Sequence, residues 1–276
     1  MKALLIGLAL AVTTVAAVAG VARATPQRPQ GGGRFQQQYM EVPGNTPYDG
    51  RFVFIRLAYG FGGGFGRNRG GPPWRHDYPR GEVHFTKILK EITFVRPRLD
   101  GSNILGLDDP ELFNYPIAYM AEPGFWSLTD KETASFRSYM KKGGFVIFDD
   151  FREEEYGIND VGHWTNLQDQ MRLVLPEARW IEIDKGSEPV WHSFFEIPNP
   201  MSLAPEPTAY GGRNLHPRYF AIFENNDPSK RMIAIANVDG DISEYWEFSD
   251  QGYAPVELSN EAYKYGINYV IYALTH

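Results

Sequence analysis

The sequence predicts a single α/β domain with a doubly wound, mainly parallel sheet that carries helices on both faces. Three observations predict it. Short apolar runs suited to buried strands alternate along the chain with segments of helical periodicity. The run at residues 145–148 is apolar throughout, as in strands covered on both faces. The segment before it opens with a capping box, Thr129 with Glu132, which marks the start of a helix.

The elements of the first half are justified in order by their composition and by what ends them. Residues 51–59 predict a strand because aromatic and branched residues fill it and the glycine-rich segment 60–71 ends it. Residues 82–92 predict a helix because their apolar side chains recur on one helical face. Residues 115–122 predict the next strand, which Pro123-Gly124 ends. The capped helix and the apolar strand then follow.

The second half continues the alternation with one interruption. Residues 167–174 predict a helix with one apolar face, which Pro176 ends. Residues 188–218 hold six prolines, so we expect a long excursion over the surface there. The chain closes with a helix at residues 258–274. Shorter apolar runs predict three more strands, at residues 178–184, 219–223 and 231–238.

The N-terminus has the pattern of an export signal. Residues 1–24 combine Lys2, an apolar stretch and a small-x-small sequence that ends at Ala24. We expect cleavage after Ala24 and a periplasmic or secreted mature chain that does not span a membrane; an uncleaved anchor is the alternative. Residues 25–47 are rich in Pro, Gly and Gln, which predicts a flexible tether. The folded domain is therefore expected at residues 48–276.

Charge and cysteine content exclude several function classes. The formal net charge is −7, and removal of Lys2 and Arg23 with the export signal makes it −9, which argues against a nucleic-acid partner. The chain has no cysteine, which excludes a thiol nucleophile, a disulfide framework and a cysteine zinc site. No His-x-His or His-Glu-x-x-His spacing occurs. The sequence alone therefore assigns no metal and no cofactor.

Six motifs occur together along the chain: Tyr59-Gly-Phe-Gly-Gly-Gly, Tyr115-Pro-Ile-Ala-Tyr, Gly143-Gly-Phe-Val-Ile-Phe-Asp-Asp, His192-Ser-Phe-Phe, Tyr245-Trp-Glu-Phe and Gly266-Ile-Asn-Tyr-Val-Ile-Tyr-Ala-Leu-Thr-His. Through them the chain, from about Tyr48 to His276, resembles the bacterial domain-of-unknown-function family 4159. The resemblance implies the class I glutamine-amidotransferase-like, flavodoxin-like group, which also includes trehalose-utilisation-type proteins. It implies a fold and no established activity.

The same resemblance bears on the expected site. In amidotransferases of that fold, a strand-turn-helix elbow presents a cysteine, and the resemblance places this elbow at residues 148–151. Residues 121–124 then resemble the neighbouring glycine-rich oxyanion loop. Because Asp149 and Asp150 occupy the elbow and no cysteine is present, we do not expect glutamine hydrolysis.

Four titratable residues are the candidate catalytic group. Asp149 and Asp150 end the central strand, where ligands bind in open α/β sheets. One of them is expected to act as a general base or metal ligand with Glu122, which ends the neighbouring strand; the alternative is that they cap the next segment and hydrogen-bond a turn. His163 follows an acidic loop and is expected either over the same crevice or exposed on a loop.

Other residues are candidates for ligand binding. The glycine-rich loop follows a strand but lacks a complete phosphate-binding motif. Large aromatic side chains near strand ends are able to stack on sugar rings, and core packing is the alternative. Residues 237–241 are expected to form a tight turn rather than a calcium loop. The candidate ligand-binding residues are Gly62, Gly63, Gly64, Trp164, His192, Tyr245 and Trp246.

Two functions from different classes follow. The favoured one is an exported cell-envelope domain that binds a small molecule, a saccharide or an envelope protein and does not catalyse a reaction, because no complete catalytic motif is present. The alternative is a carboxylate- or metal-dependent hydrolase that acts on a saccharide or cell-wall substrate. Assembly into an envelope complex is compatible with both.

Overall fold

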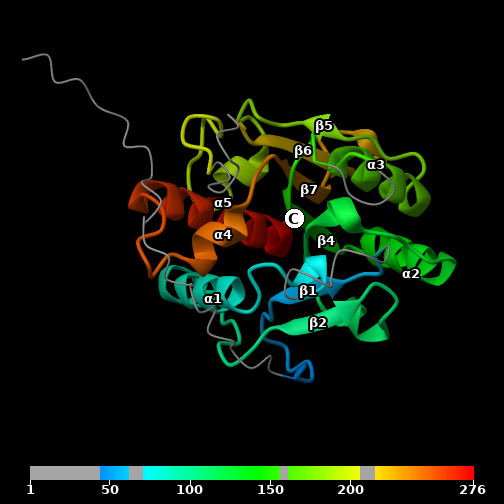
Figure 1. Cartoon of the computed structure of the whole chain (residues 1–276), viewed down its shortest axis with the longest axis horizontal. Coiled ribbons are helices and arrows are strands. Elements are labelled where there is room, and N and C mark those ends of the chain that lie inside the picture. Colours follow the sequence, from blue (N-terminus) through cyan, green and yellow to red (C-terminus); the bar gives the residue numbers. More distant parts are fainter. Residues whose placement is uncertain (1–43, 62–70, 156–160, 206–214) are drawn as a thin grey trace, which may run out of the picture. The chain divides into compact units, whose positions relative to one another are not determined.

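The computed structural model describes residues 44–61, 71–155, 161–205 and 215–276, which lie in a compact unit covering Phe35–His276 (Figure 1). These residues form a seven-stranded sheet in the order β2-β1-β3-β4-β7-β6-β5. Neighbouring strands are parallel from β2 through β7, and β6 runs antiparallel to both of its neighbours. The strands are β1 (Ile55–Ala58), β2 (Asn103–Gly106), β3 (Ile117–Ala121), β4 (Phe145–Phe151), β5 (Ile181–Glu182), β6 (Arg218–Phe223) and β7 (Met232–Val238).

Helices cover both faces of the sheet. Figure 1 shows α2 and α3 on one side and α1, α4 and α5 on the other, and each group closes its own hydrophobic core against the strands. The predicted α/β class, with a mainly parallel sheet and helices on both faces, is confirmed. The helices are α1 (Arg80–Ile92), α2 (Asp130–Lys141), α3 (His163–Val174), α4 (Ile242–Glu247) and α5 (Val256–Thr275).

Some elements differ from the sequence-based expectation. The edge strand β2 and the six-residue helix α4 were not expected, because each is too short to show a clear period. The first predicted strand shortens to β1, and the predicted strand at residues 178–184 shortens to β5. The capping box on α2 is confirmed: Thr129 accepts from the Glu132 backbone, and the Glu132 carboxylate accepts from the Thr129 backbone.

Two expectations concern segments outside the described residues. The export signal and most of the tether fall at residues 1–43, and part of the proline-rich excursion falls at residues 206–214. Among the described residues, no helix is long and apolar enough to cross a membrane.

The topology places several connections at one edge of the sheet. β1 lies between β2 and β3, so the direction of strand addition reverses there, and ligands bind at such switch points beyond the carboxyl ends of the strands. The segment after β1 includes a short 3-10 helix, η2 (Pro73–Arg75), and β3 is followed directly by another, η4 (Pro123–Phe125). The connections after β1, β3, β4 and β7 therefore meet at the carboxyl edge.

Candidate functional site

The end of β4 departs from regular strand geometry. Its pairing with β7 shifts register between Phe148 and Phe151, and Asp150 adopts a left-handed conformation with φ of 59°. This irregularity lets Asp149 and Asp150 enter different surroundings although they are adjacent. Both side chains are buried.

Asp149 is a fully hydrogen-bonded carboxylate. Its oxygens accept from the Tyr119 hydroxyl at 2.6 Å, the Asn237 amide at 2.9 Å, and the backbone N–H groups of Ile242 and Ser243 at 3.0 and 3.3 Å. Burial raises the pKa of Asp149 to about 6, and the Tyr119 and Asn237 donors oppose that rise. Because it binds the first turn of α4, Asp149 attaches this helix to the sheet. Asp149 therefore does not cap the segment that follows β4, which was the alternative expected from sequence, but binds a helix that is distant along the chain.

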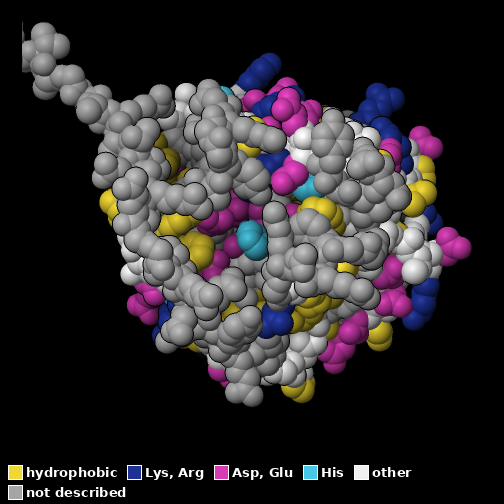
Figure 2. All heavy atoms as spheres, in the orientation of Figure 1, with side chains coloured by type: hydrophobic (Ala, Val, Ile, Leu, Met, Phe, Trp, Pro, Cys, Tyr) yellow, Lys and Arg dark blue, Asp and Glu magenta, His cyan; other side chains and the backbone are white. Residues whose placement is uncertain are grey.

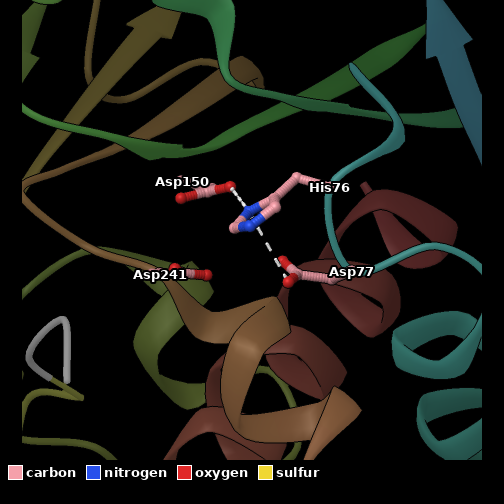
Figure 3. Close-up of side chains that lie close together, drawn as sticks. All are labelled: His76, Asp77, Asp150 and Asp241. Carbon is pink, nitrogen blue, oxygen red and sulfur yellow. Dashed lines mark hydrogen bonds and ion pairs between the residues drawn. The ribbon is translucent and has the colours of Figure 1, made fainter. Parts of the chain in front are cut away.

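Asp150 belongs to a cluster with His76, Asp77 and Asp241, which we call the His/Asp cluster (Figure 3). One ligand atom from each of the four lies within 4.8 Å of those of the others. His76 Nδ1 is 2.5 Å from an oxygen of Asp150 and 3.6 Å from Oδ1 of Asp77. His76 and Asp77 come from the connection between β1 and α1, and Asp241 comes from the connection after β7. Two connections and the end of β4 thus supply one compact group at the carboxyl edge.

Neighbouring charges shift the pKa values of the residues in the cluster. Arg152 Nη2 lies 3.4 Å from Asp150 and 3.3 Å from Asp241. Asp77 and Asp150 raise the pKa of His76 well above its usual value. Burial alone would raise the pKa of Asp150, but His76 and Arg152 lower it. Burial, and then the charges of Asp150 and Asp77, raise the pKa of Asp241 well above its usual value. In the absence of a cation, the cluster therefore favours protons on His76 and Asp241.

His76 is the member of the cluster that solvent reaches. Its side chain is 49% exposed, whereas those of Asp77 and Asp150 are 1% exposed. Figure 2 shows a histidine with acidic side chains beside it near the middle of this face. The cluster therefore has one accessible side and a buried carboxylate floor.

A buried ion pair holds the segment that carries His76. The Arg56 guanidinium, on β1, bonds the Glu82 carboxylate of α1 at 2.7 Å and donates to the backbone carbonyls of Trp74 and His76 at 3.3 and 3.0 Å. Arg56 and Glu82 are both buried. This pair fixes the backbone on which His76 and Asp77 stand.

A family model for the Domain of unknown function (DUF4159) matches residues 53–274. The chain belongs to this family. No curated protein matches the chain. The match includes every strand of the sheet and all members of the His/Asp cluster, but the family description assigns no reaction.

In the DUF4159 domain, Glu122 lies beside the cluster but outside it. Glu122 follows β3, has a φ of 53°, and donates its N–H to the carbonyl of Asp149 at 3.1 Å. The Tyr59 hydroxyl donates to the Glu122 carbonyl at 2.5 Å. Burial, and then Asp150, raise the pKa of Glu122 well above its usual value. The structure thus brings Glu122 next to the end of β4, as the sequence predicted.

The expectation of a strand-turn-helix elbow at residues 148–151 was wrong. β4 is followed by residues 152–162 before α3 begins, whereas Glu122 leads directly from β3 into η4. The residue of left-handed conformation that joins a strand directly to a helix is therefore Glu122. Pro123 follows it and has no backbone N–H, so the next residue supplies no oxyanion donor.

His163 is neither exposed on a loop nor part of the His/Asp cluster. It begins α3 and is fully buried against Gly124 and Phe125, whose ring centre is 4.6 Å from the imidazole. Its Nδ1 lies 3.9 Å from Glu155, and neither ring nitrogen has a hydrogen-bond partner among the described residues. Burial lowers the pKa of His163 to about 4. His163 is therefore neutral at neutral pH.

The described ligand-binding candidates do not join the cluster. Trp164 packs on Phe220 in the core beside α3. Tyr245 and Trp246 lie buried in the opposite core, so they present no free face for stacking on a sugar. His192 bonds Glu196 at 2.7 Å. Gly62, Gly63 and Gly64 lie outside the described residues.

Sequence reasoning missed His76, Asp77 and Asp241. Their positions along the chain could have identified them. His76 and Asp77 lie between the first strand and the helix after it, and Asp241 follows the strand that ends at Val238. In a parallel sheet, all such connections lie at one edge.

Proposed function

We propose that this domain binds a divalent cation in the His/Asp cluster and uses the bound cation to hold a ligand at the carboxyl edge of the sheet. The observation that carries the proposal is the convergence of His76, Asp77, Asp150 and Asp241 within 4.8 Å. Carboxylate oxygens with one imidazole nitrogen are a donor set that suits Mn²⁺ or Zn²⁺ and admits Mg²⁺.

Charge balance supports the proposal. The three buried aspartates of the cluster have one arginine beside them, Arg152. Buried carboxylates that face one another are costly unless a positive charge compensates them. A divalent cation would displace the protons that His76 and Asp241 hold without it, and together with Arg152 it would neutralise the three carboxylates while His76 is uncharged. Arg152, which bonds both Asp150 and Asp241, would orient these ligands from outside the coordination shell.

The test is cation binding by metal-depleted protein. We expect calorimetric titration with Mn²⁺, Zn²⁺ and Mg²⁺ to give one bound cation per chain. His76→Ala and Asp150→Asn should each weaken binding by about 100-fold or more, because each removes a ligand. His192→Ala is the matched control, since this histidine bonds Glu196 on the surface. Wild-type protein that binds no cation, or variants that bind as the wild type does, would refute the proposal.

A specific observation favours hydrolysis as a second candidate function. Glu122 ends the strand next to β4 and has a raised pKa, while the pKa of Asp150 is lowered. A carboxyl with a raised pKa beside the cation site suits the role of general acid. A bound cation would supply a nucleophilic water and polarise a substrate oxygen. Glu122 would then protonate the leaving group.

Hydrolysis is tested on cation-loaded protein with a panel of esters, amides, glycosides and cell-wall polymers. Glu122→Gln should lower kcat by 100-fold or more, within the range that general acids contribute, and leave cation affinity unchanged. Absence of turnover by the loaded wild type would leave ligand binding as the function.

We also propose that the domain acts after export. The supporting feature is the sequence pattern of residues 1–24, which predicts an export signal cleaved after Ala24, followed by the Pro-, Gly- and Gln-rich residues 25–47, which predict a tether. The order β2-β1-β3-β4 supports the amidotransferase-like fold group. Mass spectrometry of the protein recovered from the cell envelope or the medium should give a chain that begins at Thr25; a chain that retains residues 1–24 would contradict cleavage.

A further inference from the structure

We propose that Ser243 is a positioning residue of the cation site and acts through Asp77. This inference rests on the proposed cation binding and deepens it. Ser243 lies in the first turn of α4 and is fully buried. Its hydroxyl donates to Oδ2 of Asp77 at 2.5 Å. It therefore fixes one oxygen of a cluster carboxylate from outside the cluster.

The other oxygen of Asp77, Oδ1, is available to bind the cation. Oδ1 accepts from none of the N–H or hydroxyl donors of the described residues, although the side chain is 1% exposed. The carboxyl of Glu247, whose pKa burial raises to about 8, also interacts with Asp77. Oδ1 lies 3.6 Å from Nδ1 of His76, and Figure 3 shows the carboxylate turned toward the imidazole. A buried acceptor without a donor is costly, and a cation would remove that cost.

Ser243 is itself held by the hydrogen bonds of Asp149. The Tyr119 hydroxyl lies 2.8 Å from the Ser243 hydroxyl oxygen and 2.6 Å from Asp149. The Ser243 N–H also donates to Asp149 at 3.3 Å. Because the single Tyr119 proton serves Asp149, the link runs through Ser243 itself, whose N–H donates to Asp149 and whose hydroxyl donates to Asp77. Ser243 thus connects the structural aspartate of β4 to a ligand of the cation site.

Helix packing brings Ser243 and Asp77 together. A Cβ atom on Gly81, in the first turn of α1, would lie 3.5 Å from the Ser243 carbonyl oxygen and 3.7 Å from Cβ of Asp77. The N-terminal turns of α1 and α4 therefore lie directly against each other. This close packing leaves Asp77 little room to turn away from Ser243.

Outer hydrogen bonds to metal ligands typically contribute 10- to 100-fold in affinity. In Ser243→Ala, Asp149 keeps the Tyr119 and Asn237 donors and both backbone N–H groups of α4. The helix should therefore stay in place while Oδ2 of Asp77 loses its donor. We expect the affinity for Mn²⁺ to fall about 10- to 100-fold, and the melting temperature of the metal-depleted protein to fall as well, because Oδ2 of Asp77 is left without a donor.

The experiment compares Ser243→Ala with Ser259→Ala, a buried serine of α5, by Mn²⁺ titration and thermal melting. The electron paramagnetic resonance spectrum of bound Mn²⁺ should change in Ser243→Ala only, because it reports ligand geometry, which a general loss of stability would not alter. Ser243→Cys keeps the side-chain volume with a weaker donor, so its affinity should be intermediate. This variant decides the question if Ser243→Ala does not fold.

The two hypotheses fail separately. Wild-type affinity and an unchanged spectrum in folded Ser243→Ala, or in folded Ser243→Cys if that variant alone folds, would overturn the role of Ser243 and leave cation binding intact. Wild-type protein that binds no cation would overturn the proposed function and this inference with it.

Discussion

Asp149 and Asp150 are neighbours in sequence with opposite surroundings. Asp149 is met by four hydrogen-bond donors from β3, β7 and α4. Asp150 is met by His76 and Arg152 and faces two further carboxylates, Asp77 and Asp241. A carboxylate satisfied by fixed donors holds structure together, whereas carboxylates gathered with too few donors are suited to receive a cation.

Backbone conformation separates the two aspartates. A regular strand would send adjacent side chains to opposite faces of the sheet. Here the left-handed φ of 59° at Asp150 turns the second side chain toward the carboxyl edge. Asp77 and Glu122 also have positive φ, 61° and 53°. Residues in this region are strained unless they are glycine, and such strain gathers where position matters more than stability. With Asp239, which directly follows β7 and has a φ of 55°, four such described residues lie at this edge, which agrees with a functional site.

The comparison is tested most severely by exchanging each aspartate for asparagine. Asp149→Asn should lower the free energy of unfolding by about 3 kcal/mol, because an amide nitrogen would face buried donors. Asp150→Asn should change it by no more than about 1 kcal/mol, since Asp77 and Asp241 remain as partners for His76 and Arg152. Urea unfolding of the metal-depleted proteins measures both.

Cation titration of the same two variants completes the test. Asp150→Asn should lose binding, while the folded fraction of Asp149→Asn should keep most of it. The reverse pattern, a stable Asp149→Asn that does not bind and an unstable Asp150→Asn that does, would show that the roles have been assigned to the wrong residues.

Part of the candidate site was predictable from sequence because it lies on the strands. An apolar run that ends in Asp149-Asp150 places carboxylates at a strand end, and the neighbouring run places Glu122 beside them. His76, Asp77 and Asp241 were not predicted, because they stand in loops and no spacing along the chain brings them together. Their proximity depends on the strand order, which sets β7 next to β4.

The fold, like the site, was predictable only where the sequence itself carries a pattern. Long periodic segments such as α1, α2 and α5 were predicted because their apolar faces are visible in sequence. The turn at residues 237–241 was also expected, and the Gly240 N–H does bond the Asn237 carbonyl. The helix α4 that follows was missed because its six residues show no clear period, although Asp241 is its N-cap and accepts from the Glu244 N–H. Its first turn is also held by Asp149, a contact that is distant in sequence.

Two histidines with different surroundings make a similar comparison for the pH dependence of stability. His76 stands among carboxylates, whereas His163 is buried against Phe125 and has a pKa of about 4. Below the ordinary histidine pKa of 6.5, the unfolded chain takes up a proton that the folded His163 does not, so stability is lost as the pH falls from 6.5 to about 4. The loss should reach about 3 kcal/mol. His163→Phe, which keeps a ring beside Gly124, should remove it.

Denaturant unfolding of His163→Phe and the wild type between pH 4 and pH 7 measures the difference. His192→Ala is the control with the opposite sign. Hydrogen bonds to Glu196 and Gly186 raise the pKa of His192, so its contribution is present below 6.5 and lost as the pH rises through the folded value. Equal pH dependence in His163→Phe and the wild type would mean that His163 becomes protonated without cost.

The smallest effect is expected far from both aspartates, at the cap of α2. Thr129→Ala removes one side of the capping box and should cost about 1 kcal/mol. The cap is exposed and lies on the face of the sheet opposite to α4, so the affinity for the cation should not change. Urea unfolding and Mn²⁺ titration of this variant separate the two quantities. If affinity fell together with stability here, a weakened site in Asp150→Asn would no longer identify a ligand, because any loss of stability would produce it.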